Sequence, residues 1–66
     1  MREKMLKLMR EVVDGLPEDY DSTDLSGAYD ALDDAMTPEL EDWYYNLDGE
    51  RRGALGALYA QMVERR

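Results

Sequence analysis

The 66-residue chain contains no cysteine and no histidine. Without cysteine it can form neither a disulfide nor a thiolate metal site, and without histidine it lacks the most common general base near neutral pH. A chain of this length also has little room for both a core and an enclosed pocket. We therefore expect a protein that is not an enzyme and that uses no metal or other cofactor.

Long apolar segments are missing as well. No apolar run approaches the roughly 20 residues that a membrane-spanning helix requires. The N-terminal sequence MREKMLKLMREVV is amphipathic and charged, whereas a signal peptide has a continuous apolar core. These features predict a cytoplasmic protein with no membrane segment.

Positive charge is absent from most of the chain. Between Glu11 and Glu50 there are fourteen Asp and Glu residues and no Lys or Arg, and the whole chain has a net charge of −8. Binding to nucleic acid or to an anionic membrane requires clustered Lys and Arg, so we expect neither as a direct partner. The charge favours a basic protein surface as partner, although an acidic surface also serves solubility.

Apolar residues recur at helical spacing along the chain, and strand-like alternation is absent. Gly15 with Pro17, Pro38, and Asp48 with Gly49 mark the breaks between the helical segments. The pattern predicts helices at about residues 2–14, 23–36, 38–47 and 50–65. The expected fold class is all-α, a small bundle of three to four short helices that forms one domain over residues 1–66.

The same spacing predicts which side chains face the core. The expected inner-face residues are Met5, Leu6, Leu8, Met9, Val12, Val13 and Leu16, then Leu25, Ala28, Tyr29, Leu32 and Met36, then Leu40, Trp43, Tyr44 and Leu47, and finally Ala54, Leu55, Leu58, Tyr59, Met62 and Val63. The wide stripe on the first segment, built partly from Met, indicates either burial on two sides or an exposed apolar edge. Gly53 and Gly56 make the last segment slender, which indicates either tight packing within the chain or a homodimer interface.

The stretch from Asp19 to Asp24 has two further interpretations besides a connector in which Asp21 or Ser22 caps the next helix. It offers oxygens at the calcium-loop positions of Asp19, Asp21 and Thr23, but Asp24 stands where that loop needs Gly. Asp21 and Ser22 also resemble the start of the second helix in acyl and peptidyl carrier proteins. That resemblance would make Ser22 the attachment site of a phosphopantetheine arm, although Thr23 stands where the carriers have Leu.

Most of the acidic residues in the middle of the chain are expected to lie outside the core. An exposed tyrosine among carboxylates is typical of a binding hot spot surrounded by charges that steer a basic partner. The residues expected to bind such a partner are Asp30, Asp33, Asp34, Glu39, Glu41, Asp42 and Tyr45.

In composition the chain is similar to the small acidic inhibitors that phages direct against host nucleases, the anti-CRISPR and anti-restriction DNA mimics. The resemblance implies a non-enzymatic inhibitor or adaptor that occupies the basic surface of a nucleic-acid-binding protein or nuclease complex. A homodimeric structural or assembly module is the alternative, and an acyl-carrier-like protein is the third.

Overall fold

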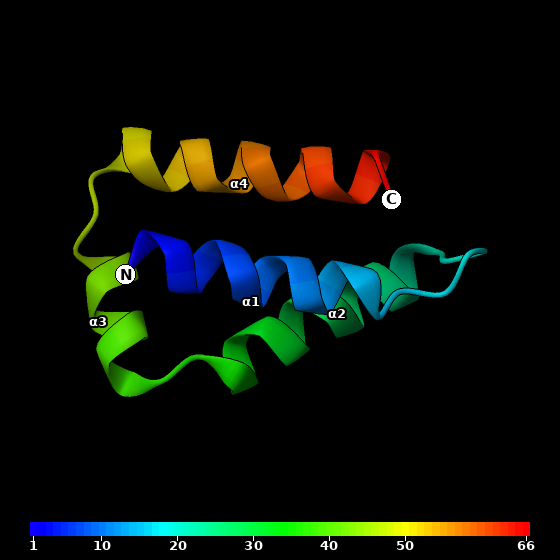
Figure 1. Cartoon of the computed structure of the whole chain (residues 1–66), viewed down its shortest axis with the longest axis horizontal. Helices are drawn as coiled ribbons and strands as arrows, with labels where there is room; N and C mark the ends of the chain where they lie inside the picture. Colours follow the sequence, from blue (N-terminus) through cyan, green and yellow to red (C-terminus); the bar gives the residue numbers. More distant parts are fainter.

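The computed structural model describes all 66 residues and contains four helices and no strand (Figure 1). The helices are α1 (Arg2–Asp14), α2 (Ser22–Ala35), α3 (Pro38–Tyr45) and α4 (Gly49–Glu64). The predicted all-α fold class is therefore confirmed, and each predicted helix end lies within two residues of the observed one. None of the four helices has both the length and the apolar character needed to cross a membrane.

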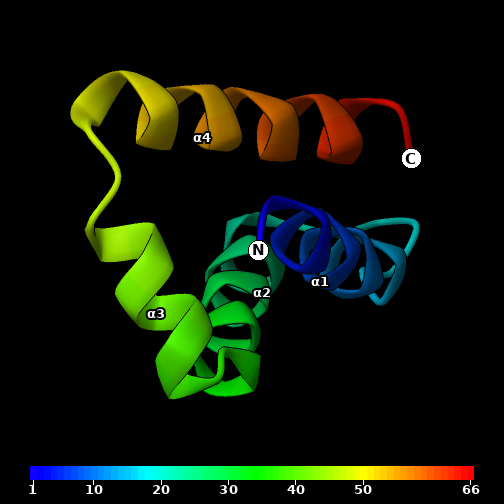
Figure 2. The same ribbon diagram turned by 60° about the vertical axis from the view of Figure 1, so that its left-hand side comes forward.

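Helix α1 is the central element of the molecule, because it packs against both α2 and α4. α1 and α4 lie side by side and run in the same direction, while α2 runs back along another side of α1 (Figures 1 and 2). The short α3 lies at one end and connects α2 to α4. The molecule measures 34 × 22 × 18 Å, so it is elongated along α1 and α4.

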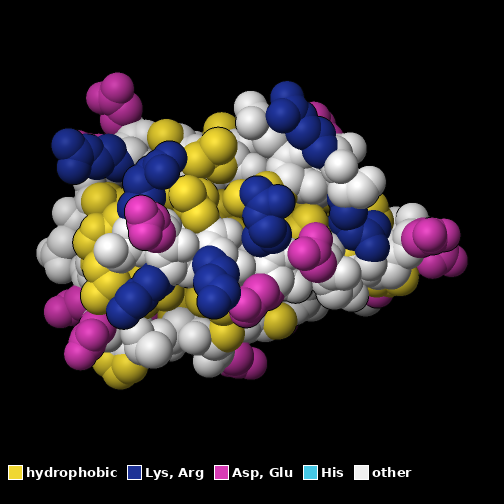
Figure 3. Space-filling model, in the orientation of Figure 1, with side chains coloured by type: hydrophobic (Ala, Val, Ile, Leu, Met, Phe, Trp, Pro, Cys, Tyr) yellow, Lys and Arg dark blue, Asp and Glu magenta, His cyan; other side chains and the backbone are white.

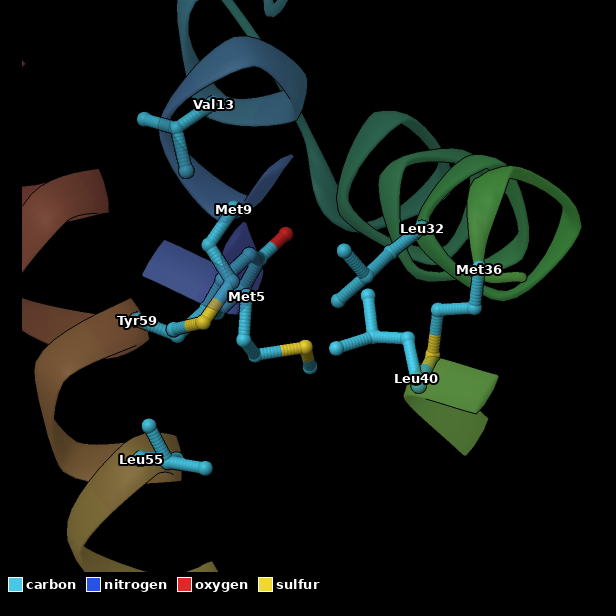
Figure 4. Close-up of a cluster of buried hydrophobic side chains, with 8 residues drawn as sticks. All are labelled: Met5, Met9, Val13, Leu32, Met36, Leu40, Leu55 and Tyr59. Carbon is cyan, nitrogen blue, oxygen red and sulfur yellow. The ribbon is translucent and has the colours of Figure 1, made fainter. Parts of the chain in front are cut away.

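The core is a single cluster of buried apolar side chains (Figure 4). Its members are Met5, Met9, Val13, Leu32, Met36, Leu40, Leu55 and Tyr59. α1 supplies three of them at a spacing of four residues, which places them on one face of the helix. Leu6, Leu8 and Val12 flank that face and are half-buried against the cluster. The wide apolar stripe of α1 thus reflects contact with helices on two sides.

Two residues predicted to lie on inner faces, Tyr29 and Ala54, are exposed, so these two predictions are wrong. Tyr29 is 57% exposed, because it lies at the edge of the buried face of α2 and covers Tyr59 from outside, with ring centroids 5.0 Å apart. Ala54 is exposed because α1 is the only long helix that packs closely on α4. The buried face of α4 is correspondingly narrow and consists of Leu55 and Tyr59.

Side-chain caps determine where α2, α3 and α4 begin. The Asp21 carboxylate accepts a hydrogen bond from the Asp24 backbone N–H, and Asp24 accepts one from the Asp21 N–H, so the two residues form a capping box. The bond from the Asp24 N–H lowers the pKa of Asp21 below its ordinary value. Thr37 and Asp48 cap α3 and α4 with one bond each: their side chains accept the backbone N–H of Leu40 and of Arg51. Of the two predicted caps of α2, Asp21 is therefore correct and Ser22 is wrong, because Ser22 is the first residue of the helix.

Arg66, the second residue after α4, links this end of the chain to the last turn of α1 and to the connector between α1 and α2. Its Nε donates to the Val13 carbonyl at 3.0 Å, and its Nη1 donates to the Pro17 carbonyl at 2.8 Å. The guanidinium also lies 5.6 Å from the centroid of the Tyr20 ring. The Val13 carbonyl is one of the last four of α1, and it also accepts the Leu16 backbone N–H at 3.1 Å. Arg66, which follows the end of α4, therefore adds a side-chain hydrogen bond at the C-terminal end of α1.

Replacing Arg66 with alanine should lower the free energy of unfolding by about 1–2 kcal/mol, because two charge-assisted hydrogen bonds and the ring contact are lost at a solvent-exposed site. Chemical denaturation followed by circular dichroism measures this change. Arg65→Ala is the matched control, since Arg65 is equally exposed and makes no such side-chain contact. Equal effects of the two substitutions would show that the Arg66 contacts contribute nothing specific.

Candidate functional site

The fold gathers the positive charges of the chain in one region, which carries acidic residues as well. All eight Lys and Arg residues belong to α1, to α4 or to the two residues after α4. Figure 3 shows this side of the molecule, with Lys and Arg side chains distributed over α1 and α4 and hydrophobic side chains between them. α2, α3 and the connectors around them carry only negative charge. The uneven distribution of charge in the sequence thus becomes an uneven distribution in space.

The seven predicted partner-binding residues are all exposed. They are Asp30, Asp33 and Asp34 on α2, and Glu39, Glu41, Asp42 and Tyr45 on α3. Residues three or four positions apart share a face of a helix. On α2 this spacing places Asp30 and Asp34 together, and it places Asp33 beside Tyr29.

The four predicted residues on α3 do not form one group. Glu41 shares a side of the helix with Tyr45, which is 62% exposed. Asp42 lies three residues from both Glu39 and Tyr45 and therefore adjoins both. Glu39 lines a surface hollow together with Lys4 and Lys7 of α1. Two basic residues therefore border Glu39, which makes it less suited than the other acidic residues to binding a basic surface.

Asp33 and Asp34 lie in the last turn of α2. The partial negative charge of the helix dipole at this end opposes carboxylates, typically by about 0.3–1 kcal/mol each. No basic residue occupies that turn to offset the effect. Local helix stability therefore does not explain why two adjacent carboxylates stand at this position.

The sequence did not predict the small hollow that Tyr59 lines, nor the burial of the Tyr59 hydroxyl. The hollow has a volume of about 60 Å³ and is lined by residues from all four helices: Met5, Met9, Tyr29, Leu32, Tyr44, Leu55, Gly56 and Tyr59. Tyr59 is only 4% exposed, and its hydroxyl has no hydrogen-bond partner. Figure 4 shows its ring reaching from α4 past Met5 and Met9, with the oxygen on the side of Leu32.

Burial affects both the pKa of the Tyr59 hydroxyl and its contribution to stability. Burial, and to a smaller extent the neighbouring Tyr29, raises the pKa of Tyr59 above its ordinary value, so the group is neutral at physiological pH. A buried hydroxyl without a partner costs about 1–3 kcal/mol of stability. Helical spacing cannot detect this hydroxyl, because it assigns tyrosine and phenylalanine alike to the core. The composition gives one indication of a buried hydroxyl. The chain has five tyrosines and no phenylalanine, so a buried ring of this kind carries a hydroxyl.

The glycines of α4 do not serve tight packing within the chain. A Cβ atom added at Gly53 or at Gly56 would meet nothing within 4 Å. Neither residue adopts a positive φ angle, so the backbone does not require glycine there either. The prediction of tight intramolecular packing is therefore wrong, whereas a contact with a second chain is not tested by these distances.

The acidic residues do not form a cluster suited to a metal ion. No group of three or more Asp, Glu, His or Cys side chains is arranged to hold one. In the stretch considered as a calcium loop, the Asp21 and Asp24 carboxylates each accept a backbone hydrogen bond within the capping box. These carboxylates therefore have a structural role at the start of α2.

The candidate functional site is thus the acidic side of α2 and α3 together with the hollow beside it. Asp33 and Tyr29 connect the two features, because they share one side of α2 and Tyr29 lines the hollow. No protein-family model matches the chain, and no curated protein or solved structure is significantly similar to it.

Proposed function

We propose that the chain is a small, non-enzymatic inhibitor or adaptor that docks the acidic side of α2 and α3 onto a positively charged surface of another protein. The observation that carries this proposal is the absence of Lys and Arg between Glu11 and Glu50. The two helices in that block are consecutive and are joined by only two residues, Met36 and Thr37. The residues of these two helices offer a partner no positive charge of their own.

The density of negative charge supports a partner that normally binds nucleic acid. Residues 15–48 carry eleven carboxylates, and the longest dimension of the molecule is 34 Å. One strand of B-DNA carries a phosphate about every 3.4 Å, or roughly ten over the same length. The acidic part of the chain thus has a charge comparable to that of one DNA strand. A cytoplasmic nuclease or other nucleic-acid-binding protein has the matching surface, as in the phage inhibitors described above.

The positions of the carboxylates favour binding over solubility as their role. Charges that serve only solubility can stand anywhere on the surface, and at the C-terminal end of α2 Lys or Arg would interact favourably with the helix dipole, whereas Asp and Glu interact unfavourably with it. Asp33 and Asp34 instead occupy the last turn of that helix. Retaining them at a cost to stability is the usual pattern for residues that are selected for function.

The test is to identify and characterise a partner under controlled salt. The immobilised chain is incubated with cytoplasmic extract of the source cells at about 50 mM NaCl, and captured proteins are identified by mass spectrometry. The affinity of the purified partner is then measured between about 50 and 500 mM NaCl. We expect a basic protein whose affinity falls at least about tenfold over this range, because salt screens charges across an interface. A partner with an acidic surface, or an affinity that salt leaves unchanged, would contradict the proposal.

A homodimeric module is the second candidate, and the open side of α4 favours it. Gly53 and Gly56 leave space on α4 that no part of the chain fills, and small residues allow another helix to approach closely. Sedimentation equilibrium over a concentration series distinguishes the two candidates. A stable dimer that captures no basic protein supports the module, whereas a monomer with a basic partner supports the inhibitor or adaptor.

A further inference from the structure

Two surface hollows follow the contact between α1 and α4 and meet at Leu58, which lines both. Because the two helices run in the same direction (Figure 1), one hollow lies toward their N-terminal ends and the other toward their C-terminal ends. Together they form one open groove, the α1–α4 groove. Arg2, Trp43 and Arg51 line its first end, and Arg10, Met62 and Arg65 line its second end.

The floor of the α1–α4 groove is apolar. On α4, Ala54, Leu58 and Met62 recur every four residues and therefore lie on one face of the helix. Ala54 is exposed, and the other two are half-buried. Trp43 and Leu47, also half-buried, extend the floor at the first end. Exposed apolar surface bordered by polar residues is typical of an interaction site.

The border of the groove is basic, although the chain as a whole is acidic. Five of the six arginines and neither lysine line the groove, which contains a single carboxylate, that of Asp14. Of the basic side chains, only that of Arg66 donates a hydrogen bond within the chain. The planar guanidinium of arginine binds both oxygens of a carboxylate at once. The groove therefore suits a ligand that combines apolar surface with carboxylates.

The positions of the arginines indicate the form of that ligand. Arg2 and Arg51 border the first end, and Arg10 and Arg65 border the second. Arg51 and Arg65 are fourteen positions apart, which corresponds to about 21 Å along a helix at about 1.5 Å per residue. A matching ligand has an apolar stripe about four turns long and carboxylates near both ends. An amphipathic helix has this form, and such helices bind in apolar grooves of partner proteins.

A membrane surface or a second copy of the chain fits the groove less well. Membrane binding requires apolar side chains that enter the lipid, whereas the apolar residues here form a floor between basic residues (Figure 3). A second copy would have to present an apolar face that is also acidic. On its acidic helices α2 and α3, the only large apolar side chains that are exposed are Tyr29 and Tyr45.

We propose that the α1–α4 groove binds an acidic amphipathic helix of a second partner protein. The apolar face of that helix packs on Leu58 and the floor residues beside it, and its carboxylates pair with the arginines at both ends. None of the acidic residues predicted to bind a basic partner lines the groove. The inference therefore goes beyond the proposed function: the chain becomes an adaptor that joins a basic protein to an acidic one.

Trp43 provides the measurement, because it is the only tryptophan of the chain and it lines the groove. The probe is a synthetic helical peptide of about 15 residues, with leucines at helical spacing, a pair of glutamates at each end and no aromatic residue. It is titrated into the chain at about 150 mM NaCl, where salt screens repulsion by the distant carboxylates of α2 and α3. We expect a saturable blue shift of the Trp43 fluorescence, with a Kd of about 10–100 μM.

A control peptide tests the role of charge in the ligand. It has glutamine in place of each glutamate and keeps the leucines, so it offers the same apolar face without carboxylates. We expect it to bind at least about tenfold more weakly, because the arginines of the groove then have no charged partner.

Two alanine positions on α4 locate the contact. Ala54→Glu places a carboxylate on the floor of the groove, where it repels the peptide and occupies its space, and should weaken binding at least about tenfold. Ala57→Glu is the matched control, because Ala57 is an exposed residue of the same helix that does not line the groove. It should weaken binding less than about threefold.

Two double variants test the arginines in the same way. Arg51→Gln with Arg65→Gln removes one charge at each end of the groove and should weaken binding about tenfold. Lys7→Gln with Arg52→Gln removes the same charge from exposed residues of α1 and α4 that lie outside the groove. This second pair should have less than a threefold effect, about the range expected for exposed charges at a distance.

Several outcomes would overturn the inference. Absence of a saturable shift, equal binding of the glutamine peptide, or equal effects within either matched pair of variants would each do so. A Trp43 shift with phosphatidylglycerol vesicles and none with the peptide would assign the groove to a membrane surface. A shift on concentrating the chain alone would assign it to a second copy. Failure to capture a basic partner would contradict only the proposed function, because the peptide contacts a different surface.

Discussion

Replacing Met9 with alanine should lower the free energy of unfolding by about 2–5 kcal/mol, the usual range for a buried methionine. Met9 is 2% exposed and lies in the middle of α1, between the side chains of α2 and α4 (Figure 4). Domains of this size have a total stability of about 3–10 kcal/mol. The loss should therefore reduce the melting temperature by at least about 10 °C, which thermal denaturation followed by circular dichroism measures.

Two control substitutions isolate the effect of burial. Met62→Ala makes the same chemical change at a half-buried position on α4, and we expect less than half the loss. Met9→Leu keeps most of the volume and should cost less than about 1.5 kcal/mol. If Met9→Ala were no more destabilising than Met62→Ala, α1 would not be the centre of the core.

Neutralising five carboxylates of α2 and α3 should weaken binding to the basic partner about 100-fold at low salt. The substitutions are Asp30→Asn, Asp33→Asn, Asp34→Asn, Glu41→Gln and Asp42→Asn. They change the net charge from −8 to −3 and remove attraction that raises both the association rate and the affinity. Titration calorimetry or surface plasmon resonance at about 50 mM NaCl measures the loss.

The matched control removes the same charge from the other region of the molecule. Glu3, Glu11, Asp14, Glu50 and Glu64 are exposed and lie on α1 and α4. Their change to Gln or Asn gives the same net charge, and we expect less than a tenfold loss of affinity. Equal losses in the two variants would show that net charge matters and that the position of the carboxylates does not.

The two five-residue variants should also differ in stability. Removing the carboxylates of Asp33 and Asp34 relieves their unfavourable interaction with the dipole of α2. A variant that binds less well while it unfolds at a higher temperature would be direct evidence that these residues are retained for binding.

Local signals in the sequence predicted the helices and most of the core. Pro38 and the caps at Asp21, Thr37 and Asp48 act within one turn of chain, so their effects depend little on the rest of the fold. Apolar spacing likewise identified Met5, Met9 and Leu32 as buried. The candidate acidic residues were predicted to be exposed for the same reason, because they lie opposite the apolar faces, and all of them are.

The errors occurred where exposure depends on how many neighbours a helix has. A helical wheel assigns Tyr29 and Ala54 to the inner faces of α2 and α4, but it contains no information about the width of the contact. Because α4 packs closely on only one long helix, its buried face is narrow. The space beside Gly56 and the exposure of Tyr29 both follow from that arrangement.

The sequence by itself determined that this is a helical chain whose middle forty residues, 11–50, carry no positive charge. Composition and spacing are sufficient for that result, because helix periodicity and charge are local properties. Only the tertiary structure decided that α1 and α4, which carry most of the bases, pack side by side, that Arg66 bonds to the end of α1, and that the Tyr59 hydroxyl is buried without a partner. These features join residues such as Val13 and Arg66 that are far apart in the chain, and only packing of the helices brings such residues together.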